Sequence, residues 1–261
     1  MPLDEHFRVV PTDAMMRLAM AIAHGRPDNR PRHHFAFLTF NYDILLEVAL
    51  TWAKLPFNYR LPSEPEDEGI PLLKLHGSVN WTRCPDCQDI VALSIPHYLP
   101  TVRAHGAQSV VLPLEAALKT NTHSSLWDRE GRLLDSPCCT RLVLPPFIVP
   151  PTWDKGQHHR GLQSVWKAAA EELSSAEQLV VVGYSLPETD AFFRYLFALG
   201  LDNHMPLEQI KVIDPTAKEG GDVRRRFGHF LGHGIEKRIQ YIPGTFEHTI
   251  GLVEALVKHA I

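Results

Sequence analysis

The fold of this chain is decided by the stretch Leu72-Leu73-Lys74-Leu75-His76-Gly77-Ser78-Val79-Asn80-Trp81. Its first four residues form a short, largely apolar run, which predicts a buried strand. The run ends at His76 and Gly77, so we expect an imidazole at the carboxyl end of that strand. Open α/β sheets bind ligands at this edge, and histidine is the side chain best suited to move a proton near neutral pH. A histidine held by hydrogen bonds in an ordinary turn is the alternative.

Strands of the same kind are predicted on both sides of this stretch. Residues 35–40 predict a buried strand that breaks at Asn41-Tyr42-Asp43, and Asp43 can cap a helix over about residues 44–52. Residues 178–182 and 209–213 predict two more strands, and residues 238–242 predict a weaker one. Further helices are expected after Thr12, over residues 162–173 and 188–199, and near the C-terminus. Apolar strands that alternate with helices predict a parallel sheet covered on both faces. We therefore expect an α/β, doubly wound, Rossmann-like fold.

A small inserted module is predicted at about residues 82–145, where the alternation of strands and helices stops. It contains all four cysteines of the chain, Cys84, Cys87, Cys138 and Cys139. Four thiolates can hold a structural zinc ion in a zinc-ribbon-like module. Adjacent cysteines point in different directions, so a histidine could replace one of them: His97, His105 or His123. Reduced cysteines in a small core are the alternative. The proline-rich residues 141–151 cannot form a helix and predict an extended return to the main body.

Composition limits the classes of protein to which the chain can belong. With 261 residues, 44% of them hydrophobic, it can bury one large core, or one core and a small module. Its formal net charge of -4 argues against nucleic acid as the main partner, and the basic run Arg224-Arg225-Arg226 is expected on a solvated helix face. We find no signal peptide and no apolar run of the ~20 residues that span a bilayer. We therefore expect a cytoplasmic protein without a membrane partner.

Polar residues follow four of the expected strands at their carboxyl ends, which share one crevice in a doubly wound sheet. Asn41 can hydrogen-bond to a ribose or an amide. Gly183 lets the backbone approach a phosphate, Ser185 can donate a hydrogen bond to it, and Asp214 suits a ribose. Each feature has an ordinary alternative, since G-x-S turns are common, Asp43 is foremost a helix cap, and Asp214 could simply form a turn.

Taken together, these motifs resemble the sirtuin-like (silent information regulator) family, whose members bind NAD and cleave it between nicotinamide and ribose. Residues 39–43, Thr-Phe-Asn-Tyr-Asp, are similar to the family's T-x-N-x-D segment, and Leu75-His76-Gly77 is similar to its L-H-G turn. Residues 181–190 resemble the G-x-S strand turn of the bacterial branch, which often carries G-Y-S-L-P. The cysteines lie where the family inserts its zinc module, and residues 149–152 follow as its extended return does. The resemblance runs from about residue 35 to the C-terminus.

The resemblance implies NAD as the substrate and a role for each matching residue. Asn41 would orient the nicotinamide ribose or an attacking water, Asp43 would support that pocket, and His76 would act as general base. The residues that contact the nucleotide would be Thr39, Gly183, Ser185 and Asp214. The zinc ligands would be Cys84, Cys87, Cys138 and Cys139.

One motif of the family is missing from the sequence. The family begins with a strand and a Gly-Ala-Gly-x-Ser turn that binds the pyrophosphate, and nothing of this kind precedes Asn41. That first strand is central in the strand order of the fold. We therefore expect a gap in the sheet, or a strand supplied by a missing N-terminal segment or a partner chain. A late start site, a split gene or a degenerate relative would each produce such a chain.

Three functions remain open at this point. The first is NAD hydrolysis with release of nicotinamide and ADP-ribose, as in the antiviral defence branch, and the G-Y-S-L-P variant favours it. The second is NAD-dependent deacylation of protein lysines, in which an acyl-lysine peptide adds a strand between the module and the main sheet. The third is a non-catalytic nucleotide-binding fragment, which the missing glycine turn favours.

Overall fold

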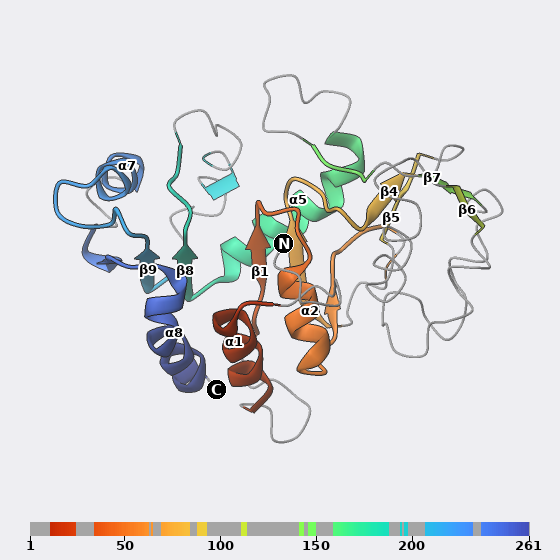
Figure 1. Ribbon diagram of the computed structural model, residues 1–261. Coiled ribbons are helices and arrows are strands. Elements are labelled where there is room, and N and C mark those ends of the chain that lie inside the picture. The colour runs from red at the N-terminus through yellow and green to blue at the C-terminus, as the bar shows by residue number, and fades with distance from the viewer. Residues whose placement is uncertain are drawn as a thin grey trace. The chain divides into compact units, whose positions relative to one another are not determined.

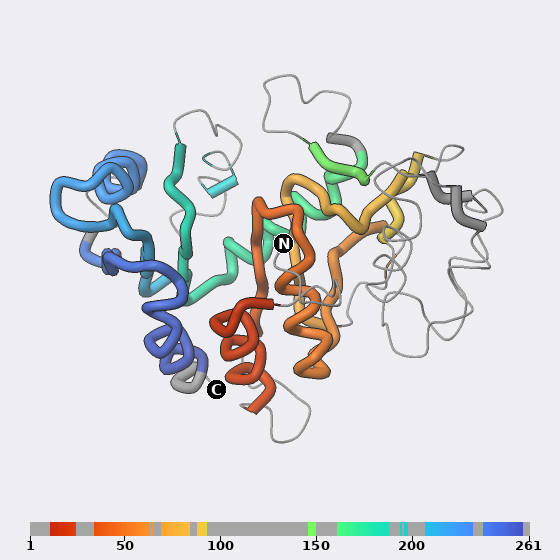
Figure 2. Tube along the Cα trace, in the orientation of Figure 1, coloured from red at the N-terminus to blue at the C-terminus, as the bar shows by residue number. Residues whose placement is uncertain are grey.

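The computed structural model describes residues 11–24, 34–62, 64, 69–83, 88–92, 111–113, 141–143, 146–149, 159–187, 194, 196–197, 207–231 and 236–260 (Figure 2). The chain divides into two compact units. The first consists of Met1–Ala23 and His33–Trp166, and the second consists of His24–Arg32 and Lys167–Ile261. Each unit has a parallel sheet and a hydrophobic core of its own.

The first unit is built on a three-stranded parallel sheet with the strand order β1-β3-β2. Its strands are β1 (Phe37–Thr39), β2 (Phe57–Asn58) and β3 (Ile70–Lys74). All five residues of the central strand β3 are buried, as expected for a strand between two parallel neighbours. β1 pairs with β3 in the register Thr39↔Lys74, so the two strands end at the same edge. The strands predicted at β1 and β3 are therefore confirmed. β2 was not predicted, because two residues are too few to show a strand pattern.

Two helices of the first unit begin close to residues that the sequence predicts as caps. α1 (Asp13–His24) follows Thr12, whose Oγ1 accepts a hydrogen bond from the Met15 N–H at 3.3 Å. α2 (Leu45–Trp52) follows Asp43, whose Oδ1 accepts a hydrogen bond from the Leu45 N–H at 3.0 Å. Both bonds satisfy backbone donors that a helix start leaves open. Asp43 thus supports the start of α2 from one position before it, and the residue at the cap position itself is Ile44.

A small antiparallel sheet with the order β5-β4-β7-β6 follows β3 in the chain (Figure 1). Its strands are β4 (Trp81–Arg83), β5 (Ile90–Ala92), β6 (Val111–Pro113) and β7 (Arg141–Val143). They occupy the range in which the sequence predicts an inserted module. The cysteines and histidines named as zinc ligands lie outside the described residues: Cys84, Cys87, Cys138, Cys139, His97, His105 and His123. The zinc site therefore stays a prediction.

The second unit carries another three-stranded parallel sheet, with the order β10-β9-β8. Its strands are β8 (Gln178–Val182), β9 (Gln209–Ile213) and β10 (Ile239–Ile242), and the arrows of β8 and β9 point the same way in Figure 1. α5 (His159–Ser175) precedes β8, and its residues divide between the two units. α7 (Asp222–Leu231), the 3-10 turn η1 (Glu236–Arg238) and α8 (Phe246–Ala260) complete the described elements. The basic run lies on α7, where Arg224 and Arg225 are exposed as predicted and Arg226 is half-buried.

The predicted α/β class with parallel strands is confirmed, and among the described residues these strands do not form one continuous sheet. Among the described residues the parallel strands form two three-stranded sheets, one in each unit. β1 and β8 are the end strands of these sheets, and Val182 at the end of β8 is 38% exposed although its strand is almost wholly apolar. The helix predicted over residues 188–199 falls largely outside the described residues. No helix in the described part of the chain is both long enough and apolar enough to cross a membrane.

Candidate functional site

Two loops at the carboxyl ends of neighbouring parallel strands form the candidate site in the first unit. One loop follows β1 and carries Asn41 and Asp43, and the other follows β3 and carries His76. The Leu75 N–H donates to the Thr39 carbonyl at 2.9 Å, which extends the strand pairing into the loops. The Val79 N–H donates to the Tyr42 carbonyl at 2.9 Å. The structure thus brings the two loops together at one edge of the sheet.

The imidazole of His76 lies in a largely buried position. His76 is 9% exposed, and the Phe40 ring packs edge-on against it with 5.2 Å between the ring centroids. The His76 carbonyl accepts a hydrogen bond from the Val149 N–H at 2.9 Å. The expectation of an imidazole at the end of a strand is therefore met, but the ring is shielded by Phe40, and sequence reasoning did not predict this shielding.

Gly77 allows the extended return to pair with the histidine loop. Gly77 forms an antiparallel bridge with Ile148, and the Ser78 N–H donates to the Phe147 carbonyl at 3.1 Å. A Cβ on Gly77 would lie 2.2 Å from the Phe147 carbonyl oxygen, and the residue has a φ of +80°. Only glycine fits both constraints. The predicted extended return is confirmed for these residues.

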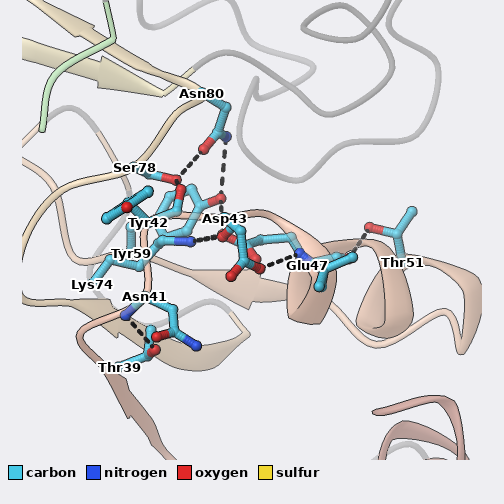
Figure 3. A network of polar contacts seen from close by, with 11 residues as sticks. Thr39, Asn41, Tyr42, Asp43, Glu47, Thr51, Tyr59, Lys74, Ser78 and Asn80 are labelled. Atoms are coloured by element: carbon cyan, nitrogen blue, oxygen red, sulfur yellow. Dashed lines mark hydrogen bonds and ion pairs between the residues drawn. The ribbon is translucent and has the colours of Figure 1, made fainter. Parts of the chain in front are cut away.

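Asn41 and Asp43 have different environments within one loop (Figure 3). Asn41 is exposed, and its backbone N–H donates to the Thr39 Oγ1 at 3.0 Å. Asp43 is half-buried, and one of its carboxylate oxygens accepts a hydrogen bond from the Leu45 N–H at the start of α2. The carboxamide of Asn41 is thus presented at the surface. Thr39 holds the backbone of the loop at Asn41, and Asp43 holds the start of the helix that follows the loop.

A buried polar cluster next to these loops was missed from the sequence. Lys74 and Glu47 form an ion pair at 2.6 Å, and Tyr59 donates to the same Glu47 oxygen at 3.2 Å. Two features of the sequence could have indicated this cluster. One is a lysine in the apolar run of β3, and the other is a glutamate among the mostly apolar residues of α2. Their pairing could not be predicted, because the partners are 27 residues apart in the chain.

The candidate nucleotide residues of the second unit lie at the ends of β8 and β9. Gly183 has a φ of +63°, and a Cβ there would meet nothing within 4 Å. The Ser185 carbonyl accepts a hydrogen bond from Arg226 at 3.3 Å. The Asp214 Oδ1 accepts hydrogen bonds from both the N–H and the hydroxyl of Thr216, each at 2.7 Å. Asp214 therefore forms a turn, which is the ordinary alternative that its sequence position allowed.

The structure brings part of the predicted site together. Asn41, Asp43 and His76 share one edge of the first sheet, and Gly183, Ser185 and Asp214 share one edge of the second. The part of the chain that the structure describes contains no group of three or more histidine, cysteine or acidic side chains placed to hold a metal ion.

Comparisons with known proteins give a remote likeness in structure alone. No protein-family pattern matches the sequence, and no curated protein matches it. The solved structures that are similar include Sir2 enzymes. One comes from work on the mechanism and regulation of Sir2 enzymes, with 15% identity, a TM-score of 0.43, and coverage of 94% of this chain and 69% of that chain. One from work on sirtuin substrate affinity has 16% identity, a TM-score of 0.43 and coverage of 95% and 73%. A Sir2 bound to an inhibitor, 2′-O-acetyl-ADP-ribose and a deacetylated peptide has 14% identity, a TM-score of 0.40 and coverage of 92% and 70%.

Proposed function

We propose that this protein cleaves NAD by hydrolysis, releasing nicotinamide and ADP-ribose. The observation that supports this proposal most is the joining of the Asn41 loop to the His76 loop. The Val79 N–H and the Tyr42 carbonyl connect the loops at 2.9 Å, and the Phe40 and His76 rings are in contact. A carboxamide and an imidazole on two connected loops are suited to hold a ribose and to take a proton from a nucleophile.

The reaction needs a nucleophile, a base and a leaving group. Water forms a bond to C1′ of the nicotinamide ribose, and the electrons of the C1′–nitrogen bond move into the pyridinium ring, which leaves as neutral nicotinamide. In the proposal, the Asn41 carboxamide orients the ribose or the water, and the neutral imidazole of His76 takes the proton. Asp43 supports this arrangement by fixing the start of α2. Because His76 is shielded from solvent, charges that develop beside it interact strongly.

Contacts with a phosphate and a ribose are also proposed for residues of the second unit, considered by itself. The backbone at Gly183 is open enough for a phosphate to approach, and the Ser185 hydroxyl is proposed to donate a hydrogen bond to that phosphate. Asp214 is retained as a candidate for a ribose contact, although one of its oxygens already holds Thr216. Thr39 contributes by holding the backbone of the Asn41 loop.

The test is nicotinamide release from NAD by the full chain. We expect release by the wild type and a loss of about 100-fold or more in His76→Ala. His229→Ala, which changes an exposed histidine on α7, serves as the matched control and should keep the wild-type rate. Absence of nicotinamide release by the wild-type chain would exclude the proposal. An acyl-lysine peptide in the same assay distinguishes the two NAD reactions, because a hydrolase consumes NAD while the peptide stays acylated.

A further inference from the structure

A buried polar network lies next to the two loops of the candidate site (Figure 3). Its centre is the ion pair between the Lys74 Nζ and the Glu47 Oε1, which are 2.6 Å apart, and both side chains are 1% exposed. Lys74 is the last residue of β3, and Glu47 lies in the first turn of α2. The ion pair therefore connects the strand that precedes the His76 loop to the helix that follows the Asn41 loop.

The network continues from Glu47 to the far end of the His76 loop. The Tyr59 O–H donates to the Glu47 Oε1 at 3.2 Å, and the Asn80 Nδ2 donates to the Tyr59 oxygen at 3.2 Å. The Ser78 hydroxyl donates to the Asn80 Oδ1 at 2.6 Å. Burial raises the pKa of the Tyr59 hydroxyl well above its ordinary value, so this hydroxyl stays protonated and remains a donor.

The same network also contacts the backbone of the Asn41 loop. The Lys74 ammonium donates to the Asp43 carbonyl, and the Ser78 hydroxyl lies 3.4 Å from the Tyr42 carbonyl. These carbonyls belong to the two residues that directly follow Asn41. One continuous set of hydrogen bonds therefore holds the backbone beside Asn41 and the turn that follows His76.

Stability alone does not account for this ion pair. Removing two charges from water costs about as much free energy as their attraction gains, and apolar side chains of similar volume often replace such a pair without loss. What the pair supplies is fixed geometry, because its hydrogen bonds form only over a narrow range of distances and angles.

We infer that Lys74 and Glu47 are positioning residues that fix the Asn41 carboxamide relative to His76. Lys74 acts through the Asp43 carbonyl, and Glu47 acts through Lys74 and Tyr59. The inference rests on the proposed function, in which the side chains of Asn41 and His76 act on the same ribose. A positioning role predicts a loss of turnover without a loss of the fold.

The main test is the double variant Lys74→Met/Glu47→Leu, which replaces both charges with apolar groups of similar length. Glu64→Gln is the matched control. Glu64 lies in the same unit, and its Oε2 accepts hydrogen bonds from the N–H groups of Tyr59 and Leu61 at 2.9 and 3.1 Å. This control changes a carboxylate beside Tyr59 but leaves the contacts of Lys74 with Glu47 and Asp43 in place.

Two measurements are made on each variant at a temperature at which near-UV circular dichroism shows the native fold. Hydrogen exchange is followed at the amides of Val79 and Leu45, with the amides of β3 as the reference. In the double variant we expect the exchange at these two amides to become about tenfold faster. The exchange rate at the reference amides should not change. We also expect kcat for nicotinamide release to fall about tenfold or more, with KM for NAD within about threefold of the wild type. The control should change neither kcat nor the exchange at these two amides relative to the β3 reference.

Unchanged exchange at Val79 and Leu45, or faster exchange with an unchanged kcat, would overturn the inference. If the wild type released no nicotinamide, the proposed function would fail, and the exchange rates would still decide whether the ion pair holds the loop. If the double variant did not fold, Tyr59→Phe would replace it, because this change removes only the hydroxyl between Asn80 and Glu47. We expect Tyr59→Phe to lower kcat about threefold and to speed exchange at Val79, and no change in either would overturn the inference as well.

Discussion

The turn that carries His76 depends on the absence of a side chain at position 77. A Cβ there would lie 2.2 Å from a backbone oxygen of Phe147, and the φ of +80° is strained for any residue with a side chain. We expect Gly77→Ala to lower the free energy of unfolding by about 3 kcal/mol or more, since the clash and the backbone strain add. Urea unfolding measures the change.

Gly183→Ala is the matched control for this prediction. Gly183 also has a positive φ, of +63°, but a Cβ there would meet nothing within 4 Å. Only the strain of the positive φ remains, so we expect Gly183→Ala to lower the free energy of unfolding by about 1 kcal/mol. Equal costs for the two substitutions would show that the contact between Gly77 and Phe147 does not constrain the turn.

Glu64 makes the stability of the first unit depend on pH. Desolvation raises the pKa of Glu64 from 4.5 to about 7, although its Oε2 accepts two backbone hydrogen bonds that favour the ionised form. Between these two values the folded chain binds a proton that the unfolded chain releases. The stabilisation from this proton is therefore complete below a pH of about 4.5 and is lost as the pH rises through about 7.

Glu64→Gln tests this pH dependence, because glutamine accepts the same hydrogen bonds without ionising. We expect the stability of the variant relative to the wild type to be greater at about pH 8 than at about pH 5, by roughly 2 kcal/mol after allowance for partial exposure. Parallel urea titrations at both pH values give this difference. A difference that does not vary with pH would mean that the carboxyl titrates normally in the folded chain.

Among the elements, the strands and caps follow the sequence closely, whereas the polar cluster does not. The apolar runs of β8 and β9 were predicted at their observed bounds, because β-branched residues bounded by turn formers are a local signal. Lys74 lies inside an equally apolar run, and its partner Glu47 lies on a helix 27 residues earlier. Local periodicity carries no information about such a pair, so the main support of the candidate site could not be predicted.

The small antiparallel sheet provides a test of the predicted zinc site. β4 ends one residue before Cys84, β7 begins two residues after Cys139, and the two strands pair at Arg83↔Val143. β4, which precedes the first cysteine pair, therefore lies beside β7, which follows the second pair. A metal ion shared by the two pairs would require this pairing. We expect about one zinc ion per chain, and a lower midpoint of thermal unfolding after chelation, because metal binding is coupled to folding.

Cys84→Ser is the variant that checks this zinc prediction. Losing one of four ligands should release most of the metal, as measured by elemental analysis of the purified protein. Restoring zinc to the chelated wild type should restore the thermal midpoint. A chain that contains no zinc and has four thiols open to titration would contradict the prediction and support reduced cysteines in a small core.

For the molecule as a whole, the class of fold was predictable and the organisation of its sheet was not. Alternating strands and helices were enough to predict parallel pairing, which both units show. Which strands are neighbours depends on contacts between distant segments. The end strand β8 illustrates this limit, because its continuous apolar run is typical of a strand with two neighbours, while Val182 is 38% exposed.

Binding of ADP-ribose to the folded chain gives a test that does not depend on turnover. A ligand that binds only the folded state stabilises it by about 2.7 kcal/mol at 100 times its Kd. We expect ADP-ribose to raise the midpoint of thermal unfolding in a concentration-dependent way. Ser185→Ala should weaken the affinity about tenfold, because it removes the hydrogen bond to a charged phosphate that we propose for this hydroxyl. His76→Ala should leave the affinity within about threefold, because the proposed role of His76 begins with the transfer of a proton. Stabilisation by ADP-ribose that survives in Ser185→Ala but disappears in His76→Ala would reverse these two assignments, and no stabilisation of the wild type would exclude nucleotide binding by this chain.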